Sequence, residues 1–439
     1  MRTSSKALAF FGLFAALAFA AAGCGGGDDE GASGDTNGTA GGDVTALSSA
    51  ACSDIYYEGE GEPDFIVASD LPLQGAGRAQ TTEMVEAIKY AIKQRNFTAG
   101  DHKIGYQSCD DSTAQQGGWD SAKCASNGRA YASNKSVIGV VGTFNSGCAK
   151  IIVPILNRAN PGPVGMVSPA NTGVGLTKSG LGADPGEPTK YYPTGKRNYA
   201  RVVARDDIQG PADAMWAKEI GIKKVFVLND KQTYGFGVAT TFRRAAEKLG
   251  LDVVGFQGWD AKQSSYEALA NSIEQAGADG VFIGGIICNN GAKLIKDLKA
   301  GVPDAKLVAP DGFSDPKSNG AAFEGSWASV AGQPPKNLKG EGKTFIDEFR
   351  TEIGRTPNPY SAYAAQAMVV MLNAIEESDG TRGSVAENLF GLKIDNGILG
   401  TFELDDNGDT DLNPITIYEQ KGTELEPVKT LDVPQDLIG

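Results

Sequence analysis

Short apolar runs alternate along most of the chain with longer segments whose apolar residues recur at helical spacing. Residues 137–141 and 164–167 form two such runs, and both are rich in valine. Between them, residues 149–158 carry Ile152 and Ile155 on one helical face. Runs of this length and composition are typical of buried parallel strands. The pattern therefore predicts a strand, a helix and a second strand in this stretch.

The same alternation continues on both sides. Further strands are expected at residues 64–68, 103–108, 199–203, 224–228, 252–256, 280–283, 306–309, 398–404 and 415–420. Residues 177–197 interrupt the pattern with an irregular insert rich in Gly, Pro and Lys, and a second series of strands and helices begins at Lys223. Two successive series predict an α/β fold with two doubly wound, Rossmann-like lobes and a cleft between them.

Polar loops follow the two valine-rich strands. Residues 143–147 and 168–172 are rich in Ser, Asn and Thr. In an open parallel sheet, ligands bind beyond the carboxyl ends of the strands, where hydroxyls, free backbone N–H groups and helix N-termini are available. Such loops also end many strands that bind nothing. On these residues alone, a carboxylate site and an ordinary strand end are both open interpretations.

The N-terminus has the pattern of an export signal. Arg2 and Lys6 precede an apolar run, residues 7–22, that ends in small residues directly before Cys24. A charged start, an apolar middle and a small-residue cleavage site predict a signal peptide over residues 1–23 rather than a core helix. Small residues before a cysteine resemble the lipobox of bacterial lipoproteins. This resemblance implies that Cys24 becomes the lipidated first residue of the mature protein.

The segment after Cys24 is expected to be a flexible tether, residues 24–61. Residues 25–51 are rich in Gly, Ala, Ser and Asp and contain no aromatic residue, a composition typical of flexible linkers. The lipobox match departs from the usual motif at Ala21, where a leucine is common. No later stretch is long and apolar enough to span a membrane, so the lipid is expected to be the only membrane anchor.

The chain is long and acidic. It has 439 residues and a formal net charge of −14, and loss of Arg2 and Lys6 with the signal brings the mature form to about −16 by the same counting. The charges are dispersed and no basic cluster occurs, so nucleic acid and anionic membrane surfaces are not expected as partners. The length beyond the leader suffices for two domains with sizeable cores.

Cysteine usage indicates disulfides in an oxidising compartment. The six cysteines are Cys24, Cys52, Cys109, Cys124, Cys148 and Cys288. With Cys24 lipidated, five are left, so at least one stays free or pairs outside the chain. Cys109 ends the second strand and Cys124 lies about a turn into the next helix, which predicts a local disulfide between them. Which of the remaining three cysteines are free is left open.

No catalytic, cofactor or metal motif is complete. His102 is the only histidine and no CxxC pair occurs, so neither a zinc site of the usual spacing nor a histidine-based triad is expected. Residues 75–80 begin like a dinucleotide fingerprint but lack its third glycine. Residues 405–411 have calcium-like carboxylate spacing, but the glycine is misplaced and Asn-Gly favours a tight turn. The chain is therefore expected to have no enzymatic activity, no cofactor and no metal.

An ordered set of loop motifs carries a family resemblance. The motifs are residues 69–75 (SDLPLQG), 142–146 (GTFNS), 168–172 (SPANT), 229–235 (NDKQTYG), 284–285 (GG) and 309–312 (APDG). Together they resemble the type I solute-binding proteins of ABC importers, and most closely the Leu/Ile/Val-binding family in its lipoprotein form. The resemblance implies a periplasmic binding protein type I fold, in which a multi-crossover hinge joins two Rossmann-like lobes.

The implied domain organisation is discontinuous. Residues 62–205 and 333–411 are expected to form lobe 1. Residues 206–332 and 412–439 are expected to form lobe 2, together with the C-terminal tail. The family often bridges the end of the second strand to the loop after the third, so the resemblance offers Cys109 with Cys148 as an alternative disulfide.

The resemblance also implies a site for a zwitterion. The ligand-binding residues that it assigns are Ser146, Ala170, Asn171, Thr172, Tyr234 and Asp311. In the family, a serine hydroxyl and backbone amides of lobe 1 hold the ligand carboxylate, and Ser146 stands at the serine position. The ammonium group is held by a threonine hydroxyl, here Thr172, and by an acidic side chain of lobe 2, here Asp311. Tyr234 matches a tyrosine that closes over the ligand.

The implied side-chain pocket departs from that of the leucine binders. Its expected lining includes Gln80, Phe144 and Ile287. Gln80 or Thr81 stands where many relatives place an aromatic residue, and Ile287 follows the glycine pair where amino-acid binders often have tyrosine. The ligand is therefore left open between a branched-chain or other small amino acid, an amide or urea, and an aromatic acid.

The function implied is that of a substrate-binding lipoprotein of an ABC importer, located outside the cytoplasm. Its expected partners are a small-molecule ligand and the permease and ATPase subunits, and the expected oligomeric state is a monomer. The alternative is a ligand-sensing receptor domain of the same fold.

Overall fold

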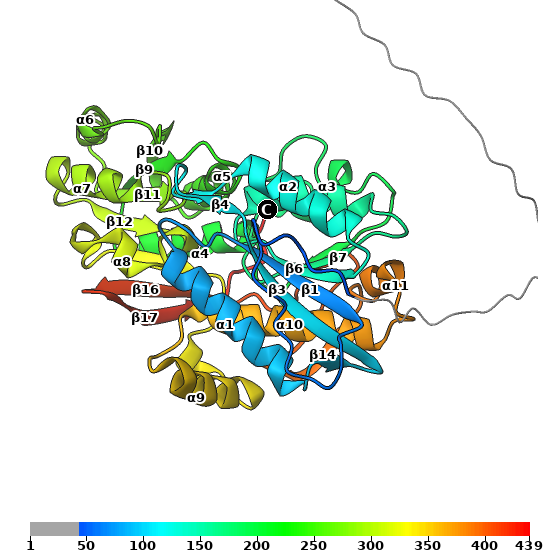
Figure 1. The fold of residues 1–439 in the computed structure, drawn as a ribbon. Coiled ribbons are helices and arrows are strands. Elements are labelled where there is room, and N and C mark those ends of the chain that lie inside the picture. The colour runs from blue at the N-terminus through cyan, green and yellow to red at the C-terminus, as the bar shows by residue number, and fades with distance from the viewer. Residues whose placement is uncertain (1–43) are drawn as a thin grey trace, which may run out of the picture. The chain divides into compact units, whose positions relative to one another are not determined.

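The computed structural model describes residues 44–439, which lie within one compact unit, Gly42–Gly439. The expected signal peptide, Cys24 and the start of the expected tether lie outside the described residues. Within this unit the chain forms two α/β lobes, each built on its own sheet (Figure 1). The predicted α/β fold with two Rossmann-like lobes is confirmed.

Lobe 1 contains a six-stranded sheet in the order β2-β3-β1-β6-β7-β8. Its strands are β1 Phe65–Leu71, β2 Thr98–Ala99, β3 His102–Asp110, β6 Val137–Gly142, β7 Gly165–Ser168 and β8 Tyr199–Arg201. All neighbours run parallel except β2 and β3, which are antiparallel. Every residue of β6 and β7 is buried, because helices cover both faces of a parallel sheet.

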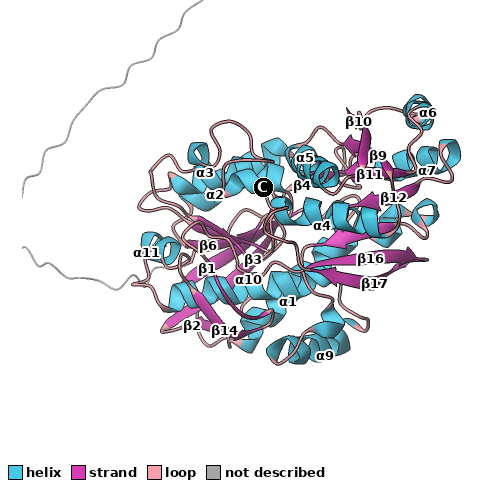
Figure 2. Cartoon of the chain, turned by 180° about the vertical axis from the view of Figure 1, so that it is seen from behind, coloured by secondary structure: helices cyan, strands magenta, loops and turns pink. Residues whose placement is uncertain are grey.

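Helices cover this sheet in two pairs. They are α1 Arg78–Gln94, α2 Ser121–Ser133, α3 Ser146–Asn157 and α10 Pro359–Glu376, with the short α11 Arg382–Glu387 beside β6 and β7. Helix α1 packs against α10 on one face, and α2 packs against α3 on the other (Figure 2). Val67 lies in the core beneath α1 and α10, whereas its neighbour Ala68 lies in the core beneath α2 and α3. This alternation follows from the pleat of the strand.

Lobe 2 contains a seven-stranded sheet in the order β10-β9-β11-β12-β13-β16-β17. Its strands are β9 Lys224–Asn229, β10 Asp252–Gly258, β11 Gly280–Gly284, β12 Lys306–Ala309, β13 Trp327–Val330, β16 Ile415–Lys421 and β17 Glu424–Leu431. The sheet is parallel up to β13, and β16 and β17 are antiparallel to their neighbours. Helices α4 Asp206–Glu219 and α5 Thr233–Lys248 cover one face, and α6 Glu267–Gln275 and α7 Gly291–Gly301 cover the other.

Several elements were not predicted. Besides β13 and β17, they include β4 Ser112–Thr113, β5 Gly118–Trp119, β14 Lys393–Gly397 and α8 Pro316–Asn319. Helix α9 spans Glu341–Ile353, and β15 Gly400–Glu403 lies within the strand expected at residues 398–404. Strand β17 has the sequence ELEPVKTL and is mostly exposed. An edge strand of this kind carries too few apolar residues to show a strand pattern.

The chain crosses between the two sheets three times. It leaves lobe 1 between β8 and α4, returns after β13 to form α10, and enters lobe 2 again between β15 and β16. Three crossings are what a multi-crossover hinge requires. We propose that the lobe boundaries lie near residues 205, 332 and 411.

The described part of the expected tether is not a tether. Leu47 is buried, and its backbone N–H donates to Gln107 Oε1 over 2.7 Å. Tyr56 forms an isolated β-bridge with Tyr106, and Cys52 is bonded to β3. The prediction was wrong for this part because a few apolar contacts and one covalent bond outweigh the polar composition of the segment.

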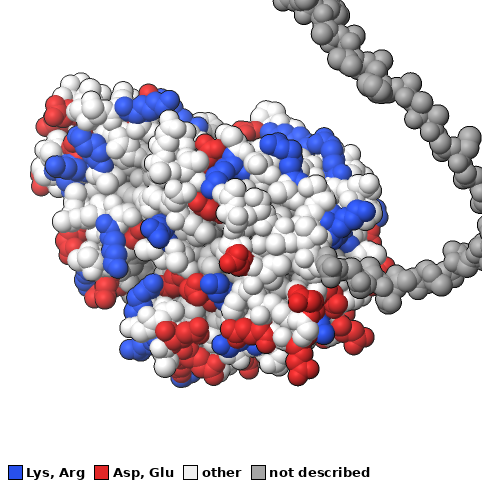
Figure 3. Space-filling model, viewed as in Figure 1, with Lys and Arg blue, Asp and Glu red and all other residues white. Residues whose placement is uncertain are grey.

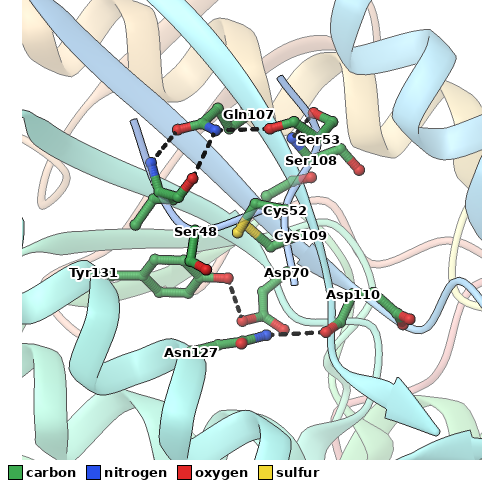
Figure 4. Close-up of a disulfide and its surroundings, with 12 residues drawn as sticks. Ser48, Cys52, Ser53, Asp70, Gln107, Ser108, Cys109, Asp110, Asn127 and Tyr131 are labelled. Carbon is green, nitrogen blue, oxygen red and sulfur yellow. Dashed lines mark hydrogen bonds between the residues drawn. A yellow bond between two sulfur atoms is a disulfide. The ribbon is translucent and has the colours of Figure 1, made fainter. Parts of the chain in front are cut away.

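The predicted disulfides were also wrong. The structure has Cys52–Cys109 and Cys124–Cys148, with partners 57 and 24 residues apart, and Cys288 is free. Figure 4 shows the segment around Cys52 lying across the end of β3, where Cys109 is located. Helices α2 and α3 pack together, which brings Cys124 to Cys148. Neither Cys109–Cys124 nor Cys109–Cys148 forms, because the N-terminal segment occupies Cys109.

Charged residues are dispersed over the face seen in Figure 3, with acidic side chains denser along its lower edge. Across residues 44–439, none of the helices has both the length and the hydropathy of a membrane span.

Candidate ligand-binding site

Ser146 lies at the start of helix α3, directly after β6 and its loop. It is buried, and its Oγ accepts a hydrogen bond from the backbone N–H of Gly173 over 3.1 Å. This bond joins the loop after β6 to the loop after β7. The first N–H groups of a helix have no partner within the helix and carry the positive end of its dipole. The surroundings of Ser146 therefore favour an anionic group.

The loop after β7 is held rigid by its own polar residues. Ser168 Oγ accepts from the backbone N–H groups of Ala170 (3.1 Å) and Asn171 (2.8 Å) and donates to the carbonyl of Thr143 (3.0 Å). From β8, the guanidinium of Arg201 donates to the carbonyls of Asn171 and Gly173 over 2.8 and 2.9 Å. These bonds fix the backbone around Thr172, which is buried.

Two of the predicted residues have mainly structural contacts. The side chain of Asn171 hydrogen-bonds to Thr143 Oγ1 and to the hydroxyl of Tyr199, within lobe 1. The backbone N–H of Ala170 is already taken by Ser168. Both residues shape the loop, and ligand contact by the hydroxyls of Ser146 and Thr172 stays a prediction.

Asp311 is the centre of the lobe 2 side. It follows β12 in a short 3-10 turn, Asp311–Phe313. The hydroxyl of Tyr234, at the start of α5, donates to Asp311 Oδ1, and the hydroxyl of Tyr360 donates to Oδ2 over 2.7 Å. Burial raises the pKa of Asp311, and the two tyrosine hydroxyls oppose this shift. The arrangement keeps a buried carboxylate hydrogen-bonded and oriented.

The two lobes meet at this point. Tyr360 comes from α10, which packs against α1 of lobe 1, so its bond to Asp311 crosses between the lobes. The ring of Phe144 lies edge-on to Tyr360 at 5.7 Å between centroids. The carbonyl of Thr172 accepts from the backbone N–H of Asp206, at the start of α4, over 2.8 Å. Asp311 and Phe144 therefore both contact Tyr360, Thr172 contacts the start of α4, and Ser146 is bonded to Gly173, the residue after Thr172.

Gln80 and Ile287 lie on the periphery of this cluster. Gln80 Nε2 donates to Ser314 Oγ across the lobes over 3.2 Å. Gln80 and Ser314 also line a groove of about 460 Å³ between the lobes, and Asp311 is not among its lining residues. Ile287 packs in the apolar core of lobe 2.

Four site residues were missed by the sequence analysis: Tyr360, Asp206, Gln209 and Asp213. The last three recur on α4 at positions i, i+3 and i+7 and are fully buried. Three polar residues on one helical face beside apolar neighbours are a signal that could have been found. Tyr360 had no such signal, because its role depends on the packing of α10 against lobe 1.

One cluster among residues 44–439 has the spacing of a metal site, formed by Asp111, Cys124 and Cys148. Both sulfur atoms are bonded to each other, and a metal needs the thiolate. In the turn at residues 405–411, Asp405 caps backbone N–H groups of Asn407 and Asp409. The tight turn predicted there is confirmed.

Known proteins resemble this chain over most of its length. A family model described as periplasmic binding protein matches residues 67–424. A leucine-, isoleucine-, valine-, threonine- and alanine-binding protein of Pseudomonas aeruginosa is 29% identical over 229 residues, which are 50% of this chain and 59% of that protein.

Solved structures share the fold. The leucine-binding protein LivK of Thermotoga maritima superposes with a TM-score of 0.72 at 22% identity, over 85% of this chain and 99% of that chain. A solute-binding protein of an ABC transporter from Rhodopseudomonas palustris, in complex with 3,4-dihydroxybenzoic acid, has a TM-score of 0.67 at 18% identity, over 85% of this chain and 98% of that chain. These likenesses confirm the expected type I fold.

Proposed function

The chain belongs to the periplasmic binding protein family, and from this premise we propose that it is the substrate-binding component of an ABC importer for a small amino acid. The family consists of binding proteins rather than enzymes and works outside the cytoplasm. The finer proposal is that the two lobes close on the solute and deliver it to the permease, with the protein acting as a monomer.

One observation carries the proposal: hydrogen-bond donors of lobe 1 and a buried carboxylate of lobe 2 both lie beside contacts between the lobes. Ser146 and the N-terminus of α3 offer donors for a ligand carboxylate. Asp311, held by Tyr234 and Tyr360, offers a negative charge for an ammonium group. Charge-assisted hydrogen bonds at both ends orient a zwitterion in a cleft that excludes water.

Two substitutions test this site. Ser146→Ala is expected to weaken amino-acid binding by about 1.5–3 kcal/mol, because a hydrogen bond to a charged group is lost. Asp311→Asn is expected to cost about 3 kcal/mol or more, because a buried ammonium loses its counter-charge. Titration calorimetry gives both values. Asp297→Asn, a buried aspartate of lobe 2 paired with Lys293, is the control, and unchanged affinity in both site variants would place the cleft elsewhere.

A second candidate function is the binding of aromatic acids. The Rhodopseudomonas structure holds such an acid, and Ile287 stands where amino-acid binders often have tyrosine. An acid without an amine gains nothing from Asp311, because a desolvated carboxylate facing another is unfavourable. Asp311→Asn would then leave affinity unchanged or raise it, so the same calorimetry separates the two functions. Neighbouring permease and ATPase genes would separate transport from sensing.

The membrane anchor is proposed to be a lipid on Cys24, which lies outside the described residues. Its support is the charged and apolar leader followed by small residues and the cysteine. Cys24→Ser is expected to release the protein from membranes in cell fractionation. A variant that stays fully membrane-bound would contradict a lipid anchor.

A further inference from the structure

A stripe of three polar residues on helix α4 continues inward from the Asp311 cluster. Asp206, Gln209 and Asp213 are all fully buried, and the spacing i, i+3, i+7 places them on one helical face. We call these residues, together with Asp311, the acid stripe. Asp206 begins α4 next to Thr172. Asp213 lies seven residues further along, about 10 Å along the helix axis.

The acids of the stripe have no counter-charge. Neither oxygen of Asp206 or of Asp213 has a hydrogen-bond partner. None of the ion pairs between residues 44 and 439 includes Asp206, Asp213 or Asp311. Buried charges in proteins are normally paired. The stripe is therefore an exception that calls for a cation or for bound protons.

Gln209 is an independent sign of a missing donor. Its Nε2 donates to Ser329 Oγ over 2.9 Å, and the same side chain lies close enough to Asp311 to lower the pKa of that carboxyl. Its Oε1 is buried and has no partner. An amide oxygen without a donor, beside carboxylates without a cation, points to a group rich in N–H or O–H donors.

The groups facing the stripe cannot neutralise it. Tyr234 and Tyr360 already donate to Asp311. The hydroxyls of Thr172 and Ser329 lie close enough to Asp206 and Asp213 to lower the pKa of these carboxyls, but they are neutral and burial outweighs them. Arg201 of β8 lowers the pKa of Asp206, but its guanidinium is bonded to Asp409.

Asp207 follows Asp206 in sequence, and it is paired with Lys178 and Arg205. It therefore adds no positive charge to the stripe.

Protonation is the state that the surroundings favour when no ligand is bound. Burial, and then the charge of Asp311, raise the pKa of Asp206 well above its ordinary value. Burial, and then Asp311 and Asp206, do the same for Asp213. Three neighbouring buried carboxyls without a cation cannot all be ionised, so protons bind to some of them.

We propose that Asp206 and Asp213 are proton-linked specificity residues, which hold protons without ligand and lose one when a ligand ammonium binds. On binding, an O–H bond of Asp206 breaks, the proton passes to the solvent, and the carboxylate pairs with the ammonium beside Asp311. Asp213 keeps its proton beside the hydroxyl of Ser329, and Gln209 Oε1 is left to accept from a donor of the ligand. Solutes of the same shape without an ammonium cannot displace the proton and are rejected. This inference rests on the proposed function.

The test is titration calorimetry of the purified chain with the twenty standard amino acids, benzoate and p-hydroxybenzoate at pH 7. Each amino acid that binds is measured again in phosphate and in Tris, because the difference in apparent enthalpy counts the protons released. Its analogue without the amine is measured in the same way. We expect about one proton released per amino acid bound and an analogue affinity at least about 100-fold weaker, since an unpaired buried charge is costly.

Variants of Asp206 and Asp213 test whether the proton released on binding comes from the acid stripe. Asp206→Asn is expected to reduce proton release to less than half of the wild-type value. It is also expected to lower the ratio of the affinities for the amino acid and for its amine-free analogue about tenfold. Asp213→Asn is expected to lower proton release and the affinity ratio by smaller amounts. Thermal unfolding of this variant shows independently whether it folds. Asp297→Asn is the matched control and should retain the wild-type values. The difference in apparent binding enthalpy between phosphate and Tris is measured on the wild-type protein. Misfolding of a variant therefore cannot hide proton release.

The outcomes separate this inference from the proposed function. An amino acid that binds without proton release, or no better than its amine-free analogue, overturns the acid stripe and leaves amino-acid binding intact. Binding of benzoate or p-hydroxybenzoate alone overturns the stripe and favours the second candidate function. If none of the probes binds, both proposals fail.

Discussion

Asp409 and Asp213 are both buried aspartates near the hinge, and their surroundings are opposite. Asp409 accepts from Arg201 Nε over 2.8 Å, from Arg205 over 2.8 Å and from the hydroxyl of Thr177 over 2.9 Å. Burial alone raises the pKa of Asp409, but Arg201 and Arg205 outweigh it, and the net shift is downward. Asp213 has no partner for either oxygen, and burial raises its pKa. Burial thus leaves a carboxylate ionised or protonated according to what faces it.

The difference corresponds to two roles. Asp409 orders Arg201, which in turn holds the carbonyls of Asn171 and Gly173 in the binding loop. Thr177 connects the same cluster to the start of the insert at residues 177–197. Asp409, Arg201, Arg205 and Thr177 therefore form a buried cluster whose charges are paired within the protein and which supports the binding loop. The acid stripe faces the ligand side, and its charges are left for the ligand to complete.

The largest expected effect on the free energy of unfolding comes from removing the charge of Asp409. Asp409→Asn should lower the free energy of unfolding by about 3–5 kcal/mol, because the buried Arg201 loses its counter-charge. Since the folded pKa of Asp409 is depressed, its stabilisation is present above the unfolded value and is lost as pH falls through the folded pKa. Urea unfolding at pH 7 and at acid pH measures both effects. A loss below 1 kcal/mol at pH 7 would contradict the structural role.

A smaller effect of opposite sign on the free energy of unfolding is expected in lobe 1. There, Asp70 and Asp111 are two neighbouring buried acids without a counter-charge. Burial raises the pKa of Asp70 to about 6, opposed by a hydrogen bond from Tyr131 (2.7 Å, Figure 4). Burial, and then Asp70, raise the pKa of Asp111. Asp111→Asn should therefore stabilise the fold by about 1–3 kcal/mol at pH 8, since a poorly satisfied buried acid is removed.

The pH profile checks the sign of this effect. Groups with raised folded pKa values contribute stability that is complete below the unfolded value, near 3.8, and is lost as pH rises through about 6 and above. The gain from Asp111→Asn should vanish near pH 4 and grow towards pH 8 in urea unfolding. A variant that destabilises equally at both pH values would show instead that the Asp111 carboxyl is needed for packing.

The smallest effect is expected on the surface. Asp347 pairs with Lys343 one turn earlier on α9, and both side chains are mostly exposed. Asp347→Asn should change the free energy of unfolding by no more than about 0.5 kcal/mol, because solvent and salt screen such a pair. The same urea series measures it beside Asp409→Asn. A comparable loss in both variants would remove the distinction between buried and exposed carboxylates.

Local chemistry determined much of the fold. The valine-rich runs of β6 and β7 can be buried only as strands covered on both faces, so their sequence predicts their structure. The polar loops at residues 143–147 and 168–172 could be predicted from the sequence, because ligand contacts in parallel sheets lie beyond strand ends. The ligand roles of Ser146, Thr172, Tyr234 and Asp311 came from the family resemblance and stay predictions.

Tertiary structure decided what depends on contacts between distant segments. Cys52 and Cys109 are 57 residues apart, and only the packing of the N-terminal segment across β3 brings them together. Strand β17 lacks an apolar pattern, because its pairing with β16 rather than burial defines it. Whether Asp213 and Asp409 are paired depends on which side chains the fold places opposite each carboxyl. The sequence shows each acid, whereas its charge state follows from desolvation and from neighbours that only folding assembles.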